Sequence, residues 1–181
     1  WNYPYNTLAP FISAIAAGNA VLIKPSEHSP SCSKVFKKLC DEFLDTRFYR
    51  VIEGGIPTGT KVTSLPVDLI CFTGSTYVGK IIARAASANL TPCILELGGK
   101  CPTIIDHTAN LDIAARRVVS TKFMNAGQTC VAPDYVFVHP KIKTEFINKV
   151  KQNINTFYTQ NPKTCPSYSR LIHKIHTERC A

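Results

Sequence analysis

Cys130 stands among residues that leave a sulfur atom open to a reaction partner. It lies in the stretch KFMNAGQTCVAPDY (residues 122–135), where its preceding neighbours are small or polar. A nucleophilic cysteine needs access, thiolate character and nearby backbone N–H groups. The small neighbours provide access, and a turn after the helix predicted to end near Met124 would provide N–H groups. Taken alone, Cys130 fits a buried structural thiol equally well.

Glu96 and Asn2 are the other candidates for chemistry. Glu96 ends an apolar run between Leu95 and Leu97, where an inward carboxylate is costly unless it has a role or a partner. Burial in such a run would raise the pKa of the carboxyl group toward the range useful for a general base. The alternative is an edge-strand Glu that reaches solvent. The amide of Asn2 has the right chemistry to donate to an oxyanion, although Asn2 alone reads as a turn residue before Pro4.

A phosphate-binding turn is predicted in FTGSTYVG (residues 72–79). The layout is that of a strand, a glycine turn and a helix start, and a helix N-terminus offers free N–H groups and a positive dipole to phosphate. Gly74 would let the backbone approach the ligand, and Gly79 would let the helix pack closely on the sheet. The spacing is neither the dinucleotide fingerprint nor a P-loop, so a plain strand-to-helix turn is the alternative.

The stretch KPSE (residues 24–27) follows another predicted strand. Ligand groups of open α/β sheets gather at the carboxyl ends of strands. Lys24 would meet a phosphate or a ribose hydroxyl, and Glu27 would accept from ribose hydroxyls. A charged loop with a turn proline is the simpler reading when the stretch is taken by itself.

The elements that would position these residues alternate between strands and helices. Strands are predicted at 20–23, 49–52, 69–72, 93–97, 103–105 and 135–139, and helices at 7–17 (capped by Asn6 or Thr7), 29–44, 78–88, 111–124, 141–157 and near Leu171. The strands are continuous apolar runs. This pattern predicts an α/β protein with largely parallel sheets. The Gly98-Gly99 break predicts two domains, residues 1–97 and 98–181.

Composition narrows the class of protein. The 181 residues carry a net charge of +9, but no aromatic-interleaved basic stripe or nucleic-acid motif is present, so we expect a solvated basic face and no nucleic-acid partner. The eight cysteines show no metal-ligand spacing, so no metal site is expected. We interpret them as reduced thiols in a cytoplasmic setting, with Cys40, Cys71 and Cys93 as packing residues. The apolar run 8–23 is too short and interrupted to span a membrane.

Together these stretches resemble the aldehyde dehydrogenase superfamily. WNYPYNTLAPFISAIAAGNAVLIKPSE, FTGSTYVGK, LELGGKCP and FMNAGQTCVAPDYV occur in the family's order and at its spacing, over essentially the whole chain. WNYP and GQTCVAPDY are more similar to the class 3 branch, which includes fatty aldehyde dehydrogenases. The resemblance implies a Rossmann-like parallel sheet of a cofactor domain in residues 1–97, followed by the start of an α/β catalytic domain in residues 98–181.

The resemblance also implies NAD(P)-dependent oxidation of an aldehyde to a carboxylic acid. Cys130 matches the nucleophile that forms a thiohemiacetal, and Asn2 with the N–H of Cys130 matches the oxyanion site. Hydride transfer to the nicotinamide then leaves a thioester, and Glu96 matches the base that activates water to hydrolyse it. The presence of this base favours hydrolysis over acyl transfer to coenzyme A.

For the cofactor, Lys24 and Glu27 match positions that hold the adenine ribose. The pyrophosphate turn corresponds to Gly74, Ser75, Thr76, Tyr77, Val78 and Gly79. A carboxylate at 27 favours NAD because it would repel a 2′-phosphate, while the tolerance of class 3 relatives leaves NADP as an alternative. Medium- or long-chain aliphatic or aromatic aldehydes and a homodimeric full-length protein are the further expectations.

The chain also departs from the family pattern. It starts inside the family's PWNYP motif and ends soon after the nucleophile region, so we interpret it as a fragment or a decayed gene copy, with any membrane anchor outside it. Cys101 follows Lys100 where Ser or Asn is more usual, and the stretch TGTKVTSLPVD is rich in β-branched residues and holds Pro66 where relatives have a short helix. A non-catalytic dehydrogenase-like binding protein and an inert fragment are the competing hypotheses.

Overall fold

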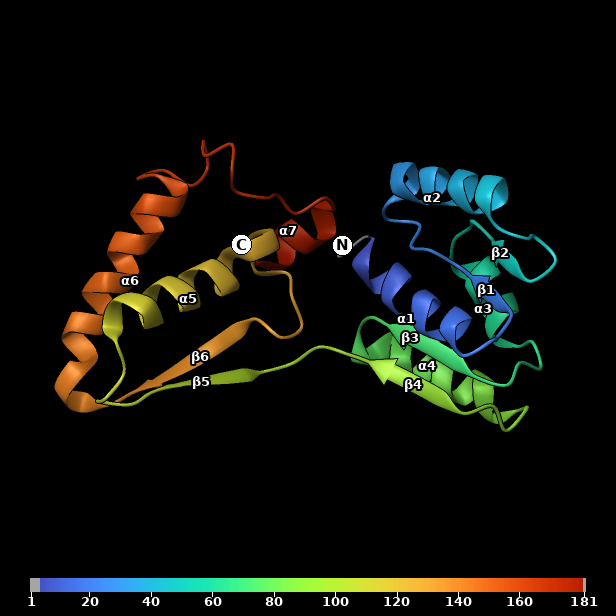
Figure 1. The fold of residues 1–181 in the computed structure, drawn as a ribbon, viewed down its shortest axis with the longest axis horizontal. Coiled ribbons are helices and arrows are strands. Elements are labelled where there is room, and N and C mark those ends of the chain that lie inside the picture. Colours follow the sequence, from blue (N-terminus) through green and yellow to red (C-terminus); the bar gives the residue numbers. More distant parts are fainter. Residues whose placement is uncertain (1–3, 181) are drawn as a thin grey trace. The chain divides into compact units, whose positions relative to one another are not determined.

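The computed structural model describes residues 4–180, whose elements are drawn in Figure 1. The chain divides into two compact units, Trp1–Leu97 and Gly98–Ala181. Strands and helices alternate in both, and every strand pair of the described residues is parallel. The predicted α/β class is therefore confirmed. The assignment of the units to a cofactor domain and a catalytic domain stays a prediction.

The first unit contains two separate two-stranded sheets with helices between their strands. Strand β1 pairs with β2, and β3 pairs with β4. The elements are α1 (Tyr5–Ala16), β1 (Val21–Ile23), α2 (Pro30–Phe43), β2 (Tyr49–Val51), α3 (Ile56–Thr63), β3 (Ile70–Thr73), α4 (Thr76–Ser87) and β4 (Cys93–Glu96).

Apolar side chains of α1, α2 and β2 form the core of this unit. Phe11 of α1 makes edge-to-face contacts with Phe36 of α2 and Tyr49 of β2, at centroid distances of 6.2 and 5.9 Å. Phe36 and Cys40 lie on one side of α2 and are buried, as the i, i+4 spacing requires. Cys40 is thus a packing residue, as predicted.

The second unit is built around one parallel strand pair. Its elements are β5 (Cys101–Ile105), α5 (Leu111–Phe123), the 3-10 turn η1 (Met124–Gly127), β6 (Pro133–Val138), η2 (Pro140–Ile142), α6 (Lys143–Tyr158) and α7 (Lys174–Cys180). Strands β5 and β6 pair with Ile104 opposite Phe137. Figure 1 shows α5 packed between this strand pair and α6.

The start of α5 is fixed by a helix cap and by the core of the second unit. Ile105, Leu111, Ala115 and Phe146 form its buried cluster. The side chain of Asn110 accepts hydrogen bonds from the first-turn N–H groups of α5 at 3.1 and 3.2 Å. The cap and the buried cluster together hold the first turns of α5 on the core of this unit.

Some sequence predictions of local structure are wrong. Helix α1 begins at Tyr5 after Pro4 rather than behind a cap at Asn6 or Thr7, and its side chains are mostly exposed or half-buried. The β-branched stretch after Gly55 forms helix α3. Pro57 suits its first turn, and the hydroxyls of Thr60 and Thr63 bond back to carbonyls one turn earlier.

The outer faces of the strand pairs are apolar and exposed in this chain. Ile104 and Phe137, opposite one another on β5 and β6, are 75% and 61% exposed. No helix within residues 4–180 combines the length and apolar character needed to cross a bilayer.

Candidate functional site

Cys130 lies in an irregular turn between α5 and β6. Helix α5 gives way to η1, in which Asn125 and Ala126 have φ angles of 53° and 55°. These left-handed conformations are uncommon for residues other than glycine and mark a locally strained backbone. Asn125 and Gln128 exchange side chain-to-backbone hydrogen bonds, of which the one from Gln128 Nε2 measures 2.9 Å. The predicted turn after the helix is therefore present, and Cys130 is half-buried within the segment that it forms.

Glu96 is the last residue of β4. Burial alternates along this strand, with Cys93 and Leu95 half-buried and Ile94 and Glu96 exposed. The expectation of an inward, buried carboxylate is wrong for this chain. The reason is the sheet itself: α4 packs against the face that carries Leu97, and the face that carries Glu96 is open.

The face of β3–β4 that carries Glu96 also carries Cys71. The register places Cys71 opposite Ile94 and Thr73 opposite Glu96. Partial burial and the nearby negative charge of Glu96 raise the pKa of the Cys71 thiol. Cys71 is exposed, so its prediction as a packing residue is wrong, whereas Cys93 on the opposite face is half-buried.

Glu96 belongs to the first unit and Cys130 to the second. Asn2 lies outside the described residues. Nowhere in residues 4–180 do three or more His, Cys, Asp or Glu side chains gather in a way that would hold a metal ion. All eight cysteines are free thiols.

The turn from β3 into α4 has the geometry of an anion-binding helix start. Ser75 is the N-cap of α4, and its Oγ accepts from the N–H of Val78 at 3.3 Å. The N–H groups of Thr76 and Tyr77 precede the first intrahelical hydrogen bond, so they point toward the helix N-terminus. The N–H of Gly74 donates to the carbonyl of Glu96 at 3.0 Å and anchors the turn to β4.

Two glycines shape this turn. A Cβ on Gly79 would lie 2.9 Å from Cδ2 of Leu97, so the helix packs closely on this side chain at the end of β4. The predicted packing role of Gly79 is confirmed. A Cβ on Gly74 would lie 2.5 Å from the ring of Phe72, so this position, too, has no room for a side chain.

Lys24 and Glu27 meet at the carboxyl end of β1. Nζ of Lys24 donates to Oε2 of Glu27 over 2.7 Å. Partial burial by itself would raise the pKa of Glu27, but the hydrogen bond and the charge of Lys24 outweigh it and the pKa lies below its usual value. The carboxylate is therefore ionised at neutral pH and oriented by its neighbour.

Glu27 lines a recess of about 240 Å³ at this edge of the sheet. The other residues that line it are Pro25, Ser26, Pro30, Ser33, Glu53, Gly54 and Gly55. None of these residues was predicted to bind a ligand, although Gly54 and Gly55 follow a predicted strand. Because β1 and β2 are parallel neighbours, the segments that follow them meet at one edge. Applied to the sequence, this geometry would have predicted that residues 24–27 and 53–55 lie together.

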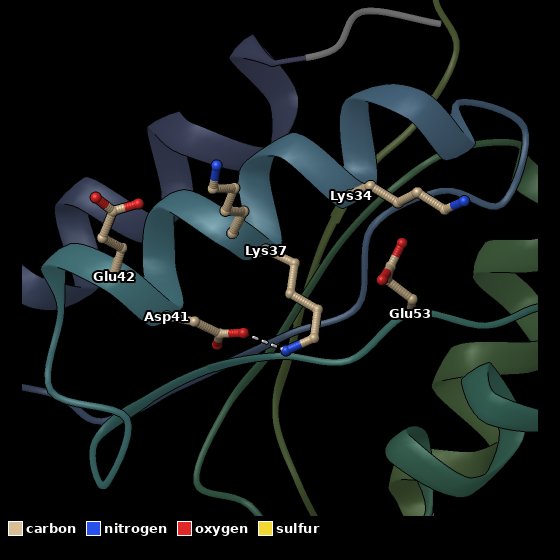
Figure 2. A pocket seen from close by; sticks show the side chains of 6 residues that line it. Lys34, Lys37, Asp41, Glu42 and Glu53 are labelled. Atoms are coloured by element: carbon tan, nitrogen blue, oxygen red, sulfur yellow. Dashed lines mark hydrogen bonds and ion pairs between the residues drawn. The ribbon is translucent and has the colours of Figure 1, made fainter.

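A second, wider depression runs along α2 and is shown in Figure 2. Its lining is charged throughout, with Lys34, Lys37, Lys38, Asp41 and Glu42 from α2 and Glu53 from the segment after β2. Lys37 turns toward Asp41 and pairs with it at 2.5 Å (Figure 2). None of the predicted site residues lines this depression, and its mixed charges give it no preference for one ligand class.

Parallel strand pairs with helices between their strands make this an α/β chain, and comparison with known proteins gives its family. Residues 1–181 match the model of the aldehyde dehydrogenase family, so the chain belongs to that family. It spans about two fifths of the length of the curated relatives that it matches.

Curated relatives support the class 3 resemblance. The chain is 47% identical over 180 residues to 4,4′-diaponeurosporen-aldehyde dehydrogenase of Staphylococcus aureus, covering 99% of this chain and 39% of that protein. It is 46% identical to the mouse aldehyde dehydrogenase named dimeric NADP-preferring, with 99% and 40% covered. Mouse aldehyde dehydrogenase family 3 member A2 is 44% identical, with 99% and 37% covered. The resemblance to the class 3 branch is confirmed.

Solved structures share the fold of the chain. The substrate-bound state of Staphylococcus aureus AldH aligns with a TM-score of 0.91 at 46% identity, covering 99% of this chain and 39% of that one. AldC of Pseudomonas syringae (mutant C291A), complexed with NAD+ and octanal, aligns with a TM-score of 0.80 at 30% identity, covering 92% and 35%.

Proposed function

We propose that the full-length protein oxidises an aldehyde to a carboxylic acid, with NAD(P) as the oxidant and Cys130 as the nucleophile. The observation that carries the proposal is the half-buried position of Cys130 in a strained turn among small residues, in a chain of the aldehyde dehydrogenase family. Residues 1–97 are assigned to the cofactor domain and residues 98–181 to the start of the catalytic domain.

Cys130 begins the reaction. Its sulfur attacks the carbonyl carbon of the aldehyde and forms a thiohemiacetal, and the carbonyl oxygen becomes an oxyanion. The N–H of Cys130 and the amide of Asn2 donate hydrogen bonds to this oxyanion, because preorganised donors stabilise charge that develops in the transition state. Bound NAD(P)+ would supply the acceptor for a hydride from the same carbon, which would leave an acyl thioester on Cys130.

Glu96 completes the reaction as a general base. Its carboxylate takes a proton from a water molecule, and the hydroxide so formed attacks the thioester carbon. The carboxylic acid leaves, Cys130 is restored as the thiolate that attacked the aldehyde, and the proton on Glu96 is released to solvent. The position of Glu96 at the carboxyl end of β4 supports this role, since ligand and catalytic groups of parallel sheets gather at that edge.

The residues present fit an anionic dinucleotide. At the start of α4, the N–H groups of Thr76 and Tyr77 suit a pyrophosphate, and the absence of side-chain room at Gly74 keeps the turn compact. The ionised Glu27, held by Lys24, suits the hydroxyls of a ribose. A carboxylate there repels a 2′-phosphate, so we infer a preference for NAD. The mouse relative's NADP-preferring name makes NADP the alternative.

The substrate is inferred from the relatives. Their names and titles include a diaponeurosporen-aldehyde and octanal, both long or medium aliphatic aldehydes. We therefore propose medium- or long-chain aliphatic or aromatic aldehydes. The name of the mouse relative also supports a homodimer. The free cysteines agree with a reducing, cytosol-like compartment. The 181 residues alone are expected to be inactive, because their strand pairs expose apolar faces.

The direct test is Cys130→Ala in the full-length protein, with aldehyde-dependent NADH formation as the measurement. We expect activity to disappear while NAD binding remains. Cys32→Ala on the exposed side of α2 is the matched control and should keep parental activity. Activity that survives Cys130→Ala would refute the catalytic assignment. A parent protein that binds NAD without turnover would instead favour a non-catalytic binding protein.

A further inference from the structure

We propose that Cys101 is a positioning residue that holds the backbone of Cys130 through its thiol; this rests on the proposed role of Cys130 as nucleophile. Cys101 is the first residue of β5, and its Sγ donates a hydrogen bond to the carbonyl oxygen of Cys130 over 3.3 Å. Both residues are half-buried and both lie in the second unit, so this contact belongs to one compact body.

Gly99 lies against the same carbonyl group of Cys130 and leaves no space beside it. A Cβ at this position would lie 2.5 Å from the carbonyl oxygen of Cys130 and 3.1 Å from Sγ of Cys101. Real Cβ atoms do not approach that closely, so the backbone of Cys130 rests against the Gly99–Cys101 segment with no room to spare. A tightly packed contact of this kind transmits small displacements instead of absorbing them.

The strand pairing explains why Cys101 points at this carbonyl. Cys101 pairs with Pro133, and the register of β5 and β6 shifts between Cys101 and Pro102. Such an irregularity bends a strand and re-aims the side chain beside it. Pro133 has no N–H to contribute to the ladder, so the pairing is weakest just where the Cys130 turn enters β6.

The turn that contains Cys130 has few hydrogen bonds of its own among those described, so a contact from another element would stabilise it. It follows three residues with positive φ, Asn125, Ala126 and Gly127, and it is closed internally by the bond from the N–H of Ala132 to the carbonyl of Thr129. The bond from Cys101 ties this segment to β5. A fixed carbonyl restricts rotation about ψ of Cys130, and the direction of its Cα–Cβ bond is then restricted as well. A nucleophile needs this because small misplacements of a reacting atom cost large factors in rate.

The chemistry of the donor makes the proposal specific. A thiol is a weak donor, whereas a hydroxyl is a stronger and shorter one, so Ser at position 101 should hold the same carbonyl. Ala removes the donor and leaves the backbone unchanged. Cys93→Ala is the matched control, because Cys93 is also half-buried at the start of a strand and its thiol also bonds to a backbone carbonyl, that of Thr91 at 3.8 Å, but in the first unit.

The experiment compares these variants in the full-length protein. We expect Cys101→Ala to lower kcat roughly tenfold with an unchanged KM for NAD. Cys101→Ser should stay within about threefold of the parent, and Cys93→Ala should match the parent. Hydrogen exchange of the amides in residues 129–132 should be faster in Cys101→Ala and parental in Cys101→Ser. If Cys101→Ala does not fold, Cys101→Val fills the space without a donor and carries the same expectations.

The two readouts separate the proposals. Parental kcat and parental exchange in Cys101→Ala would overturn the positioning role, as would a Ser variant as impaired as the Ala variant. If instead Cys130→Ala keeps its activity, the proposed function is wrong, and the exchange rates still decide whether Cys101 holds the turn.

Discussion

Leu97 packs against Gly79, with its Cδ2 2.9 Å from the point that a Cβ on Gly79 would occupy. The contact brings the first turn of α4 down onto the end of β4. It therefore sets the position of the N–H groups of Thr76 and Tyr77 relative to the sheet edge where Glu96 ends its strand. One close contact between helix and strand thus serves both packing and the proposed pyrophosphate site.

Gly79→Ala should destabilise the protein and weaken NAD binding together. The added methyl group must push Leu97 or the helix aside, and overpacking of this kind costs about 1–3 kcal/mol. Chemical denaturation and equilibrium NAD binding of the full-length protein measure the two effects. Gly59→Ala in α3 is the matched control, because nothing lies within 4 Å of a Cβ there and Ala favours a helix. Equal effects of the two substitutions would contradict the close-packing argument.

The Lys24–Glu27 pair predicts how NAD binding depends on pH. Glu27 accepts from ribose hydroxyls most strongly as a carboxylate, and its pKa lies below the ordinary 4.5 because the hydrogen bond and charge of Lys24 outweigh the effect of partial burial. Affinity should therefore be constant from neutral pH down to about 4.5. Lys24→Met removes the hydrogen bond and the charge of Lys24, so the pKa of Glu27 rises. The affinity for NAD should then begin to fall at a higher pH than in the parent.

Glu27→Gln separates this effect from a general loss of charge. It should weaken NAD binding about tenfold or more, since hydrogen bonds to charged groups contribute about 1.5–3 kcal/mol. The ratio of NAD affinity to NADP affinity should also become smaller. Glu42→Gln changes the same charge on α2, in the depression of Figure 2 and outside the recess, and should bind as the parent does. Parental binding in Glu27→Gln would remove the ribose assignment.

The sequence predicted elements well where periodicity was strong and failed where burial depends on neighbours. The apolar spacing of Phe36 and Cys40 and the strand of Ile105 correspond to buried positions. Glu96 and Cys71 were wrongly expected to be buried. A continuous apolar run predicts a strand with two covered faces, but it does not show whether this stretch of chain supplies the elements that cover them. Helix α3 was missed, because Thr60 and Thr63 bond to carbonyls of their own helix, a compensation that composition does not reveal.

The candidate site was predictable residue by residue but not as an arrangement. Ser75 as a helix cap and the turn before Cys130 follow from residue types. The recess shared by Glu27 and Gly54 depends on the pairing of β1 with β2, and the bond from Cys101 to Cys130 depends on a register shift in β5. Contacts between residues far apart in sequence are set by strand pairing, which a single sequence does not specify.

Cys130 and Cys71 should differ in their rates of alkylation. The residue Cys71 is exposed at the surface, but desolvation of its sulfur by neighbouring atoms and the charge of Glu96 raise its thiol pKa, so little of it is thiolate near neutral pH. Iodoacetamide should therefore label Cys130 faster than Cys71 or Cys93 in the full-length protein, as peptide mass spectrometry would measure. Equal rates would count against an activated thiol at Cys130. Glu96→Gln should speed the labelling of Cys71, because it removes one cause of the raised pKa.

Glu96→Gln should also separate the two halves of the proposed reaction. Glutamine cannot take a proton from water, so hydrolysis of the thioester on Cys130 slows, whereas attack by the sulfur does not require Glu96. Rapid mixing with aldehyde and NAD should show an initial burst of NADH of about one equivalent per active site, followed by turnover slowed roughly 100-fold or more. Glu53→Gln, which alters another carboxylate of the recess that Glu27 lines, should keep parental turnover at saturating NAD. A Glu96→Gln protein without a burst would mean that this carboxylate acts before the thioester forms, for example by deprotonating Cys130, and the division of labour between the two residues would have to be reassigned.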